Sequence, residues 1–185
     1  MTNIWQGKLV RLRAVEPQDW QAFFDWGQDT DFGRWSYWIP FPRSQEAAKK
    51  WTADLALAGE KNHEFRWVIE TLSGEFAGTL NTHTCDPRVG TFQYGLGVKR
   101  EQWRNGYASE AIKIVLGYFF GELRYQKVNV WVYAFNEPSL KLHRKLGFRE
   151  EGRLRRTVYT DGRHHDEVIL GMTAEEFEAV EPVKH

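Results

Sequence analysis

The sequence predicts an α+β fold in which about seven strands form one sheet flanked by helices. Three short β-like runs follow one another between residues 65 and 98, separated by turn residues, which is typical of an antiparallel meander. From Ala108 to Phe119, apolar residues recur at i, i+3, i+4, i+7, i+8 and i+11, the pattern of a helix with one buried face. A chain of 185 residues fits a single domain spanning 1–185, since domains usually hold about 100–200 residues.

The first third of the chain is predicted to contain one strand and two helices. Apolar and basic residues alternate over 8–14, which indicates a strand. Pro17 after Glu16, with Asp19 following, opens a helix that runs toward Trp26. Two prolines and a glycine predict a loop over 32–43, and the next helix is capped at residue 44 and extends to about 58.

The rest of the chain alternates strands and helices. Strands are expected at 65–70, 76–84, 91–98, 127–133, 151–159 and 165–172. A helix begins at Pro138 and is ended by Gly147, and a short final helix follows Thr173. Asp161-Gly162 between the last two strands is a strong hairpin signal.

Composition excludes several classes of protein. Lys plus Arg and Asp plus Glu both number 25, so no global charge attracts nucleic acid or an anionic membrane. The longest apolar stretch, 114–120, is far shorter than the ~20 residues of a membrane span, and no signal-peptide pattern is present. A single cysteine, Cys85, requires no oxidising compartment, so we expect a cytoplasmic protein. Nine tryptophans suggest a cleft lined by aromatic side chains.

An anion site is predicted where the strand 91–98 leads into the helix from Ala108. Gly106 lets the backbone approach a ligand closely, and the first N–H groups of a helix attract a phosphate. Lys99, Arg100 and Arg104 add local positive charge. The alternative is an ordinary strand–helix turn that contains a glycine. Gly95-Leu-Gly97 lacks the third glycine of a dinucleotide fingerprint, and no P-loop motif occurs.

A second cluster of polar residues lies on the predicted helix after residue 136. Asn136, Ser139 and His143 stand at i, i+3 and i+7, so they share one stripe and would line one wall. Taken singly, each has an ordinary interpretation: Asn136 and Ser139 as capping or turn residues, and His143 as a surface histidine.

Together the two segments resemble the GNAT superfamily of N-acetyltransferases, and most closely its RimJ/RimL-like branch, which acetylates protein N-termini and assorted small amines. The cofactor motif Q/R-x-x-G-x-G/A appears as Trp103, Gly106 and Ala108, with Trp103 departing from Gln or Arg. The later signature N-x-x-[AS] appears as Asn136 and Ser139, followed by Lys145 to Phe148 and Glu151-Gly152. The resemblance covers nearly the whole chain and implies a central, twisted, mixed and mostly antiparallel sheet.

The resemblance also implies acetyl-CoA as cosubstrate and no metal. The backbone of Leu96 to Val98 would hold the pantetheine arm, and the amides of Trp103 to Ala108 the pyrophosphate. Asn136 and Ser139 match positions that contact the cofactor near its sulfur. The cofactor-binding residues expected in this way are Leu96, Val98, Trp103, Arg104, Asn105, Gly106, Tyr107, Ala108, Ser109, Asn136 and Ser139.

Many members carry at this position a Tyr that acts as the acid and protonates the departing thiolate. This sequence has His143 there, so the resemblance suggests His143 as the acid, and Ser139 is the competing catalytic residue. Gln93 stands where many relatives have Glu, so a strong base is missing, although His83, Glu110 and His165 remain alternatives. An α-amine needs little basic assistance, so we expect a protein or peptide N-terminus, ribosomal-protein-like, as the acceptor. The alternatives are a small-molecule amine (polyamine, aminoglycoside or amino acid) and a non-catalytic acyl-CoA-binding module.

The region that shapes the acceptor pocket in similar enzymes corresponds to the aromatic segment 32–43. Trp35, Tyr37 and Trp38, together with Gln93, are therefore expected to bind the acceptor, the alternative being ordinary packing of the aromatic rings. Adjacent His164 and His165 point to opposite faces of a strand, so they do not predict a metal site. The last hairpin could offer an edge for a homodimer.

Overall fold

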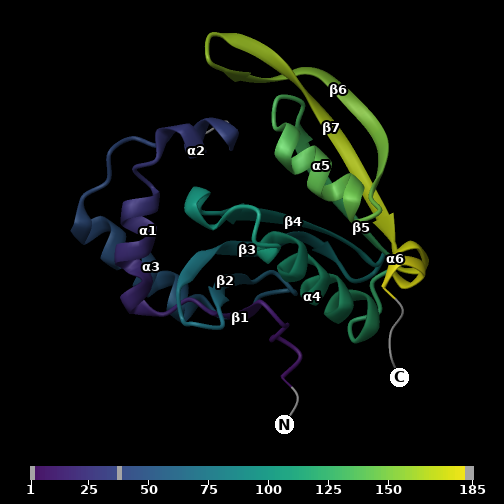
Figure 1. Ribbon diagram of the computed structural model, residues 1–185, viewed down its shortest axis with the longest axis horizontal. Coiled ribbons are helices and arrows are strands. Elements are labelled where there is room, and N and C mark those ends of the chain that lie inside the picture. Colours follow the sequence, from purple (N-terminus) through teal and green to yellow (C-terminus); the bar gives the residue numbers. More distant parts are fainter. Residues whose placement is uncertain (1–2, 37–38, 182–185) are drawn as a thin grey trace.

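The computed structural model describes residues 3–36 and 39–181. A seven-stranded sheet in the order β1-β2-β3-β4-β5-β7-β6 forms its centre (Figure 1). Every neighbouring pair is antiparallel except β4 and β5, which confirms the mixed, mostly antiparallel sheet. The strands are β1 (Val10–Ala14), β2 (Arg66–Thr71), β3 (Phe76–Asp86), β4 (Thr91–Val98), β5 (Lys127–Tyr133), β6 (Arg149–Thr160) and β7 (Arg163–Thr173).

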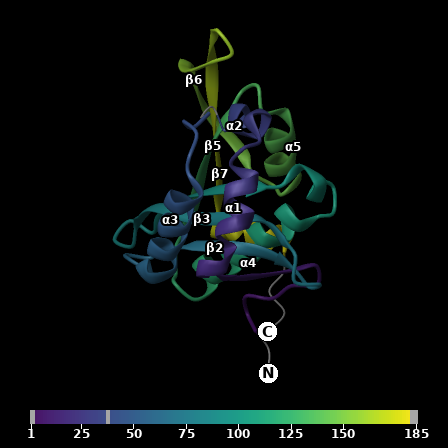
Figure 2. The same ribbon diagram turned by 90° about the vertical axis from the view of Figure 1, so that its left-hand side faces the viewer.

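Helices cover both faces of the sheet (Figures 1 and 2). The helices are α1 (Trp20–Trp26), α2 (Thr30–Trp35), α3 (Gln45–Ala58), α4 (Tyr107–Gly121), α5 (Glu137–Lys145) and α6 (Ala174–Val180). The apolar stripe of α4 is buried against the sheet as its periodicity predicts, together with inward residues such as Leu80 and Phe92. Their chain neighbours on β3 and β4 face the other side, where α1 lies: Trp26 packs directly over Gly97.

One predicted loop is partly wrong, because residues 30–35 form the helix α2. The side chain of Asp29 caps it by accepting a hydrogen bond from the N–H of Phe32 (3.0 Å). The prolines that indicated a loop begin only at Pro40, so they do not interrupt this short helix. The sequence signal therefore placed the start of the loop too early.

The sheet opens between β4 and β5. These two strands pair only at Thr91–Gln93 with Lys127–Asn129, and β4 continues to Val98 without β5 beside it. Beyond that point β5 follows β7, with which it pairs along its whole length. The edge of β4 from Tyr94 to Val98 thus borders an opening in the middle of the sheet.

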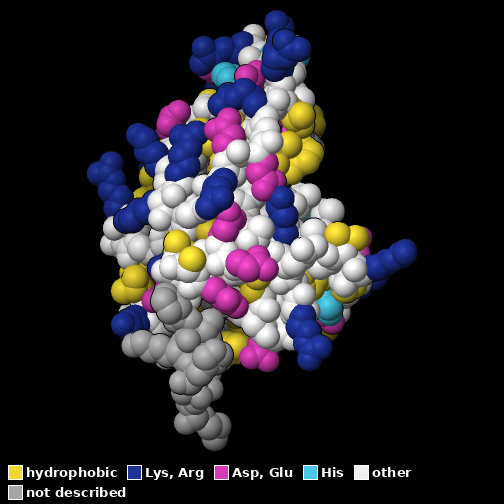
Figure 3. Space-filling view, turned by 90° about the vertical axis from the view of Figure 1, so that its right-hand side faces the viewer, with side chains coloured by type: hydrophobic (Ala, Val, Ile, Leu, Met, Phe, Trp, Pro, Cys, Tyr) yellow, Lys and Arg dark blue, Asp and Glu magenta, His cyan; other side chains and the backbone are white. Residues whose placement is uncertain are grey.

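The β6–β7 hairpin projects beyond the rest of the molecule (Figure 1). Basic side chains gather at its far end (Figure 3), where Arg155, Arg156 and Arg163 are exposed. The neutral net charge therefore hides a local basic surface. β6 is an outer strand of the sheet, and a homodimer through it stays a prediction.

Neither a membrane span nor a metal cluster is evident in the described part of the chain. None of its helices is long and apolar enough to cross a bilayer. Within residues 3–36 and 39–181, no three His, Cys, Asp or Glu side chains are arranged to hold a metal ion.

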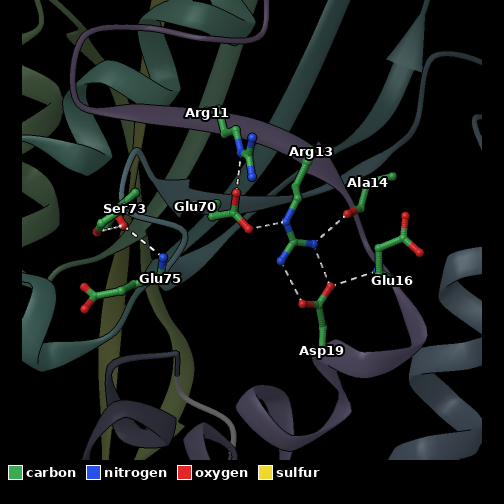
Figure 4. Close-up of polar contacts among 9 residues, drawn as sticks. Arg11, Arg13, Ala14, Glu16, Asp19, Glu70, Ser73 and Glu75 are labelled. Atoms are coloured by element: carbon green, nitrogen blue, oxygen red, sulfur yellow. Dashed lines mark hydrogen bonds and ion pairs between the residues drawn. The ribbon is translucent and has the colours of Figure 1, made fainter.

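A buried ionic network joins β1, β2 and the start of α1 (Figure 4). Arg13 donates to both carboxylate oxygens of Asp19 (2.8 Å each) and to Glu70 (2.6 Å). Arg11 also contacts Glu70, whose side chain is 7% exposed. Burial alone would raise the pKa of Glu70, but hydrogen bonds from Arg13 and Arg11 outweigh it and hold that pKa below the ordinary value.

We expect Glu70→Gln to lower the free energy of unfolding by about 2 kcal/mol at pH 7, because it leaves two arginines without their shared partner. Since the folded pKa of Glu70 is depressed, this contribution is complete above the unfolded pKa of about 4.3 and disappears as pH falls through the folded pKa. Urea unfolding at pH 7 and in acid measures both effects. Glu46→Gln, at an exposed ion pair with Lys49, is the control. Equal losses in the two variants would contradict the prediction.

Candidate active site

The turn that leads into α4 presents a row of free backbone donors. Among the described residues, the N–H groups of 104–109 have no hydrogen-bond partner. Arg104 (φ 65°) and Gly106 (φ 83°) both adopt the left-handed conformation, which turns successive amides outward into a concave anion site. At Trp103 the geometry departs from expectation, because its N–H donates to the carbonyl of Arg100 (3.1 Å) and is not free.

The edge of β4 beside the opening includes both residues expected to hold the pantetheine arm. Leu96 is half-buried and Val98 is buried. The indole N–H of Trp103 donates to the carbonyl of Val98 (2.7 Å), which fixes the turn to the end of β4. The predicted strand edge and the predicted anion site are therefore joined in one continuous surface.

Asn136 connects α5 to α2 at the same opening. Its side-chain oxygen accepts from the N–H of Ser139 (3.1 Å) and so caps α5. Its amide nitrogen donates to the carbonyl of Trp35 (3.2 Å) on α2. The capping role that the sequence allowed is present, and it also positions Ser139 and Trp35 relative to each other.

His143 is buried, with 4% of its surface exposed, and both ring nitrogens are engaged. Nδ1 lies 2.8 Å from the carbonyl of Ser139, which can only accept, so Nδ1 carries the proton. Nε2 then accepts from the hydroxyl of Tyr94 (2.9 Å). Burial lowers the pKa of His143 to about 4, against a weaker opposing effect of the Ser139 carbonyl. At neutral pH this side chain is therefore an uncharged imidazole. Its buried environment does not favour the role of acid that the sequence analysis expected.

Tyr94 and Ser139 complete the polar cluster around His143. Tyr94 lies on β4 and is buried, and burial raises its pKa well above the ordinary value. Ser139 is only half-buried, and its Oγ lies 3.3 Å from Nδ1 of His143. Sequence reasoning missed Tyr94, because the only local signal is its alternation with other inward residues of β4.

Two cavities adjoin the opening. The smaller, about 360 Å³, is lined by Trp35, Trp103, Phe135 and His165 with several charged residues. The larger, about 660 Å³, lies on the α1 side of the sheet. Its walls include several Phe and Trp side chains, and its floor includes Arg66 on β2, Asn81 on β3 and the bare backbone of Gly95 on β4.

The residues expected to bind the acceptor are not all together. Trp35 lines the smaller cavity, whereas Gln93 is paired within the sheet opposite His83 and lines neither cavity. Tyr37 and Trp38 lie outside the described residues.

The three alternative bases lie in different environments. Glu110 accepts hydrogen bonds from the N–H groups of Lys8, Leu9 and Val10 (2.7–2.8 Å) and so anchors the start of β1. His83 contacts Thr84, and burial lowers its pKa. His165 lines the smaller cavity, and its buried Nε2 has no partner among the described residues.

The chain is similar in sequence to known proteins. The family model described as "Acetyltransferase (GNAT) domain" matches residues 10–149. An SPbeta prophage-derived uncharacterized N-acetyltransferase, YokL from Bacillus subtilis (strain 168), is 41% identical over 94% of this chain and 95% of its own. The spermidine N(1)-acetyltransferase of Escherichia coli (strain K12) is 23% identical over 87% of this chain and 84% of its own.

Solved structures show the same fold. Spermidine N-acetyltransferase from Vibrio cholerae, in complex with CoA and spermine, superimposes with a TM-score of 0.79 at 19% identity, covering 92% of this chain and 99% of that one. With the family model over most of its length and a close relative along nearly all of it, the chain belongs to the GNAT family and is an acetyl-CoA-dependent N-acetyltransferase.

Proposed function

We propose that the acceptor is an α-amine, with the N-terminus of a protein or peptide favoured. The cavity linings support this most directly: no carboxylate is among the described residues that line the larger cavity, and the two that line the smaller one, Asp31 and Asp161, are ion-paired with arginines. Without a strong base the amine must arrive uncharged. At pH 7 about one-seventh of an α-amine of pKa ~7.8 is neutral, but only about one in 2,500 of a lysine-type amine of pKa ~10.4.

Different groups of this chain would bind acetyl-CoA, protonate the leaving sulfur and position the proton donor. The free amides of residues 104–109 fit the diphosphate of acetyl-CoA, because they are unpaired donors at a helix N-terminus. When bound, acetyl-CoA supplies the thioester that the amine attacks. As the C–S bond breaks, Ser139, which is only half-buried, gives its hydroxyl proton to the leaving sulfur, and the proton that the attacking amine loses restores the hydroxyl. His143 is a positioning residue: its neutral ring joins Ser139 on α5 to Tyr94 on β4.

Two relatives favour different acceptors. YdaF from Bacillus subtilis (strain 168), 29% identical over 91% of this chain and 93% of its own, carries the provisional name of a ribosomal N-acetyltransferase. The spermidine enzymes favour a polyamine instead, and this small-molecule acceptor is the second candidate. The α-amine is preferred because a polycation needs carboxylates around it, and the described lining of the larger cavity has none. Membership of the RimJ/RimL-like branch stays a prediction.

Thiol release in the presence of acetyl-CoA tests the acceptor class. We expect release with a peptide bearing a free α-amine and little with a peptide whose only amine is a lysine side chain. The rate at subsaturating peptide should rise with pH up to about 8, about tenfold per unit below the amine's pKa, because only the free base reacts. A thermal-unfolding comparison of acetyl-CoA, CoA and NADH checks cofactor binding separately. Spermidine reacting faster than the peptide would overturn the proposal.

A further inference from the structure

Arg66 is the feature of the larger cavity that the proposed function leaves unused. It lies on β2 opposite Asn81 of β3, which in turn lies opposite Gly95 of β4. The three positions form a row across one face of the sheet, and the row ends where β4 leaves β5. Since Gly95 brings no side chain, the cavity floor runs from Arg66 to the opening in the sheet.

Arg66 has no acidic partner in the described part of the chain. No carboxylate oxygen there lies within 4.0 Å of its guanidinium, and its one polar side-chain contact is a long 3.5 Å approach to Thr79 Oγ1. Burial lowers its pKa, with no opposing effect from an acid. Glu64 is close enough to raise the pKa of His83 but does not compensate Arg66.

Arg13, on the same face of the sheet, is a half-buried arginine that does have acidic partners. Arg13 lies opposite Val68, two residues along β2 from Arg66, and it is held by two carboxylates (Figure 4). The hydrogen bonds that Arg13 donates to Asp19, the largest effect, raise the pKa of Arg13 despite burial. A half-buried guanidinium without such partners is costly, so an unpaired one facing a cavity is typical of an anion-binding site.

The other polar groups of the cavity agree with an anionic occupant. Arg43 adds a second cation, held over the ring of Trp51 at 5.0 Å. The side-chain amide of Asn81 has no hydrogen-bond partner among the described residues, so it is available to a ligand. The aromatic walls suit the apolar part of the same molecule.

We propose that Arg66 binds a carboxylate of the acceptor, so that the substrate is an α-amine that also carries a negative charge. This inference rests on the proposed function, because it places the acceptor in the larger cavity. The carboxylate comes either from an acidic side chain close to a peptide N-terminus or from a free amino acid. A polycationic acceptor is disfavoured at this site, because Arg66 would repel it.

Matched acceptors distinguish these sources. The peptides Ala-Glu-Ala-amide and Ala-Gln-Ala-amide have similar α-amines and differ by one carboxylate; alanine and alaninamide, compared per neutral amine, form the free amino-acid arm. We expect at least about a tenfold preference in kcat/KM for the carboxylate member of one pair. In Arg66→Gln the preference should fall below about twofold with acetyl-CoA affinity unchanged, and Arg66→Lys should restore part of it. Arg88→Gln, at an exposed turn residue far along the sheet, is the control that keeps the preference.

The two proposals can fail separately. Equal rates within both pairs, or a preference that persists in Arg66→Gln, would overturn the carboxylate site while thiol release upholds the acetyltransferase assignment to α-amines. If no α-amine releases thiol, the proposed function fails. The carboxylate site at Arg66 is then tested by measuring the binding of acetylated peptides. Calorimetry with CoA-loaded protein then compares the acetylated Glu and Gln peptides: tighter binding of the Glu product that is lost in Arg66→Gln supports the site, and equal binding refutes it.

Discussion

Gly106→Val should weaken acetyl-CoA binding by at least about 100-fold. Gly106 has φ 83° and caps α4, and a β-branched residue strongly disfavours that left-handed conformation. A Cβ there would also lie 3.1 Å from the side chain of Leu9. The turn must therefore change its backbone angles, which removes the aligned N–H groups of residues 104–109 from the anion. The dissociation constant from calorimetry measures the effect directly.

A matched variant separates this loss from simple instability. Gly74 has φ 90° in the turn between β2 and β3, with open space around it. Gly74→Val therefore introduces comparable backbone strain away from the site and should reduce stability while acetyl-CoA affinity stays within about twofold. Retained affinity in Gly106→Val, or equal loss in both variants, would remove the predicted diphosphate site.

Ser139→Ala should lower kcat by about 100-fold, the usual size of a general-acid contribution. The backbone N–H of Ser139 still donates to Asn136, so the start of α5 is kept and acetyl-CoA affinity should change little. Steady-state kinetics with a fixed α-amine peptide give kcat, and calorimetry gives the affinity. Ser73→Ala, which removes a hydroxyl from the β2–β3 turn, is the control. An unchanged kcat would assign the role of proton donor to water or to another residue.

His143 can be tested by the pH dependence of the same reaction. With its pKa lowered to about 4, wild-type kcat should show no ionisation near pH 6.5 that belongs to this residue. His143→Gln should lower kcat but leave the shape of the profile unchanged, as a positioning residue requires. A limb near pH 6.5 that vanishes in His143→Gln would restore the histidine as the acid.

Local patterns predicted the parts of the molecule that depend on neighbours in sequence. The stripe from Ala108 to Phe119 is the buried face of α4, and Asp161-Gly162 is the hairpin turn between β6 and β7. Gly106 lies in the turn before α4 where the sequence placed it, and the structure shows it in the left-handed conformation. These features are set within a few residues by backbone conformation and by side-chain periodicity.

Contacts between distant segments decided the chemical roles of individual side chains. The hydrogen bond from Tyr94 to His143 spans 49 residues, and it accompanies the burial that keeps the imidazole neutral. Glu110 was an alternative base until its three hydrogen bonds to residues about 100 positions earlier showed a structural role. No spacing along the chain reports whether an arginine such as Arg66 meets a carboxylate.

The sequence by itself thus determined the family, the order of strands and helices apart from α2, and the two motifs that flank the opening in the sheet. The tertiary structure alone decided which polar groups are paired, which are buried and which remain free to bind a substrate. The physical reason is that a pKa and a binding site depend on desolvation and on nearby charge, and both come from segments that only folding brings together.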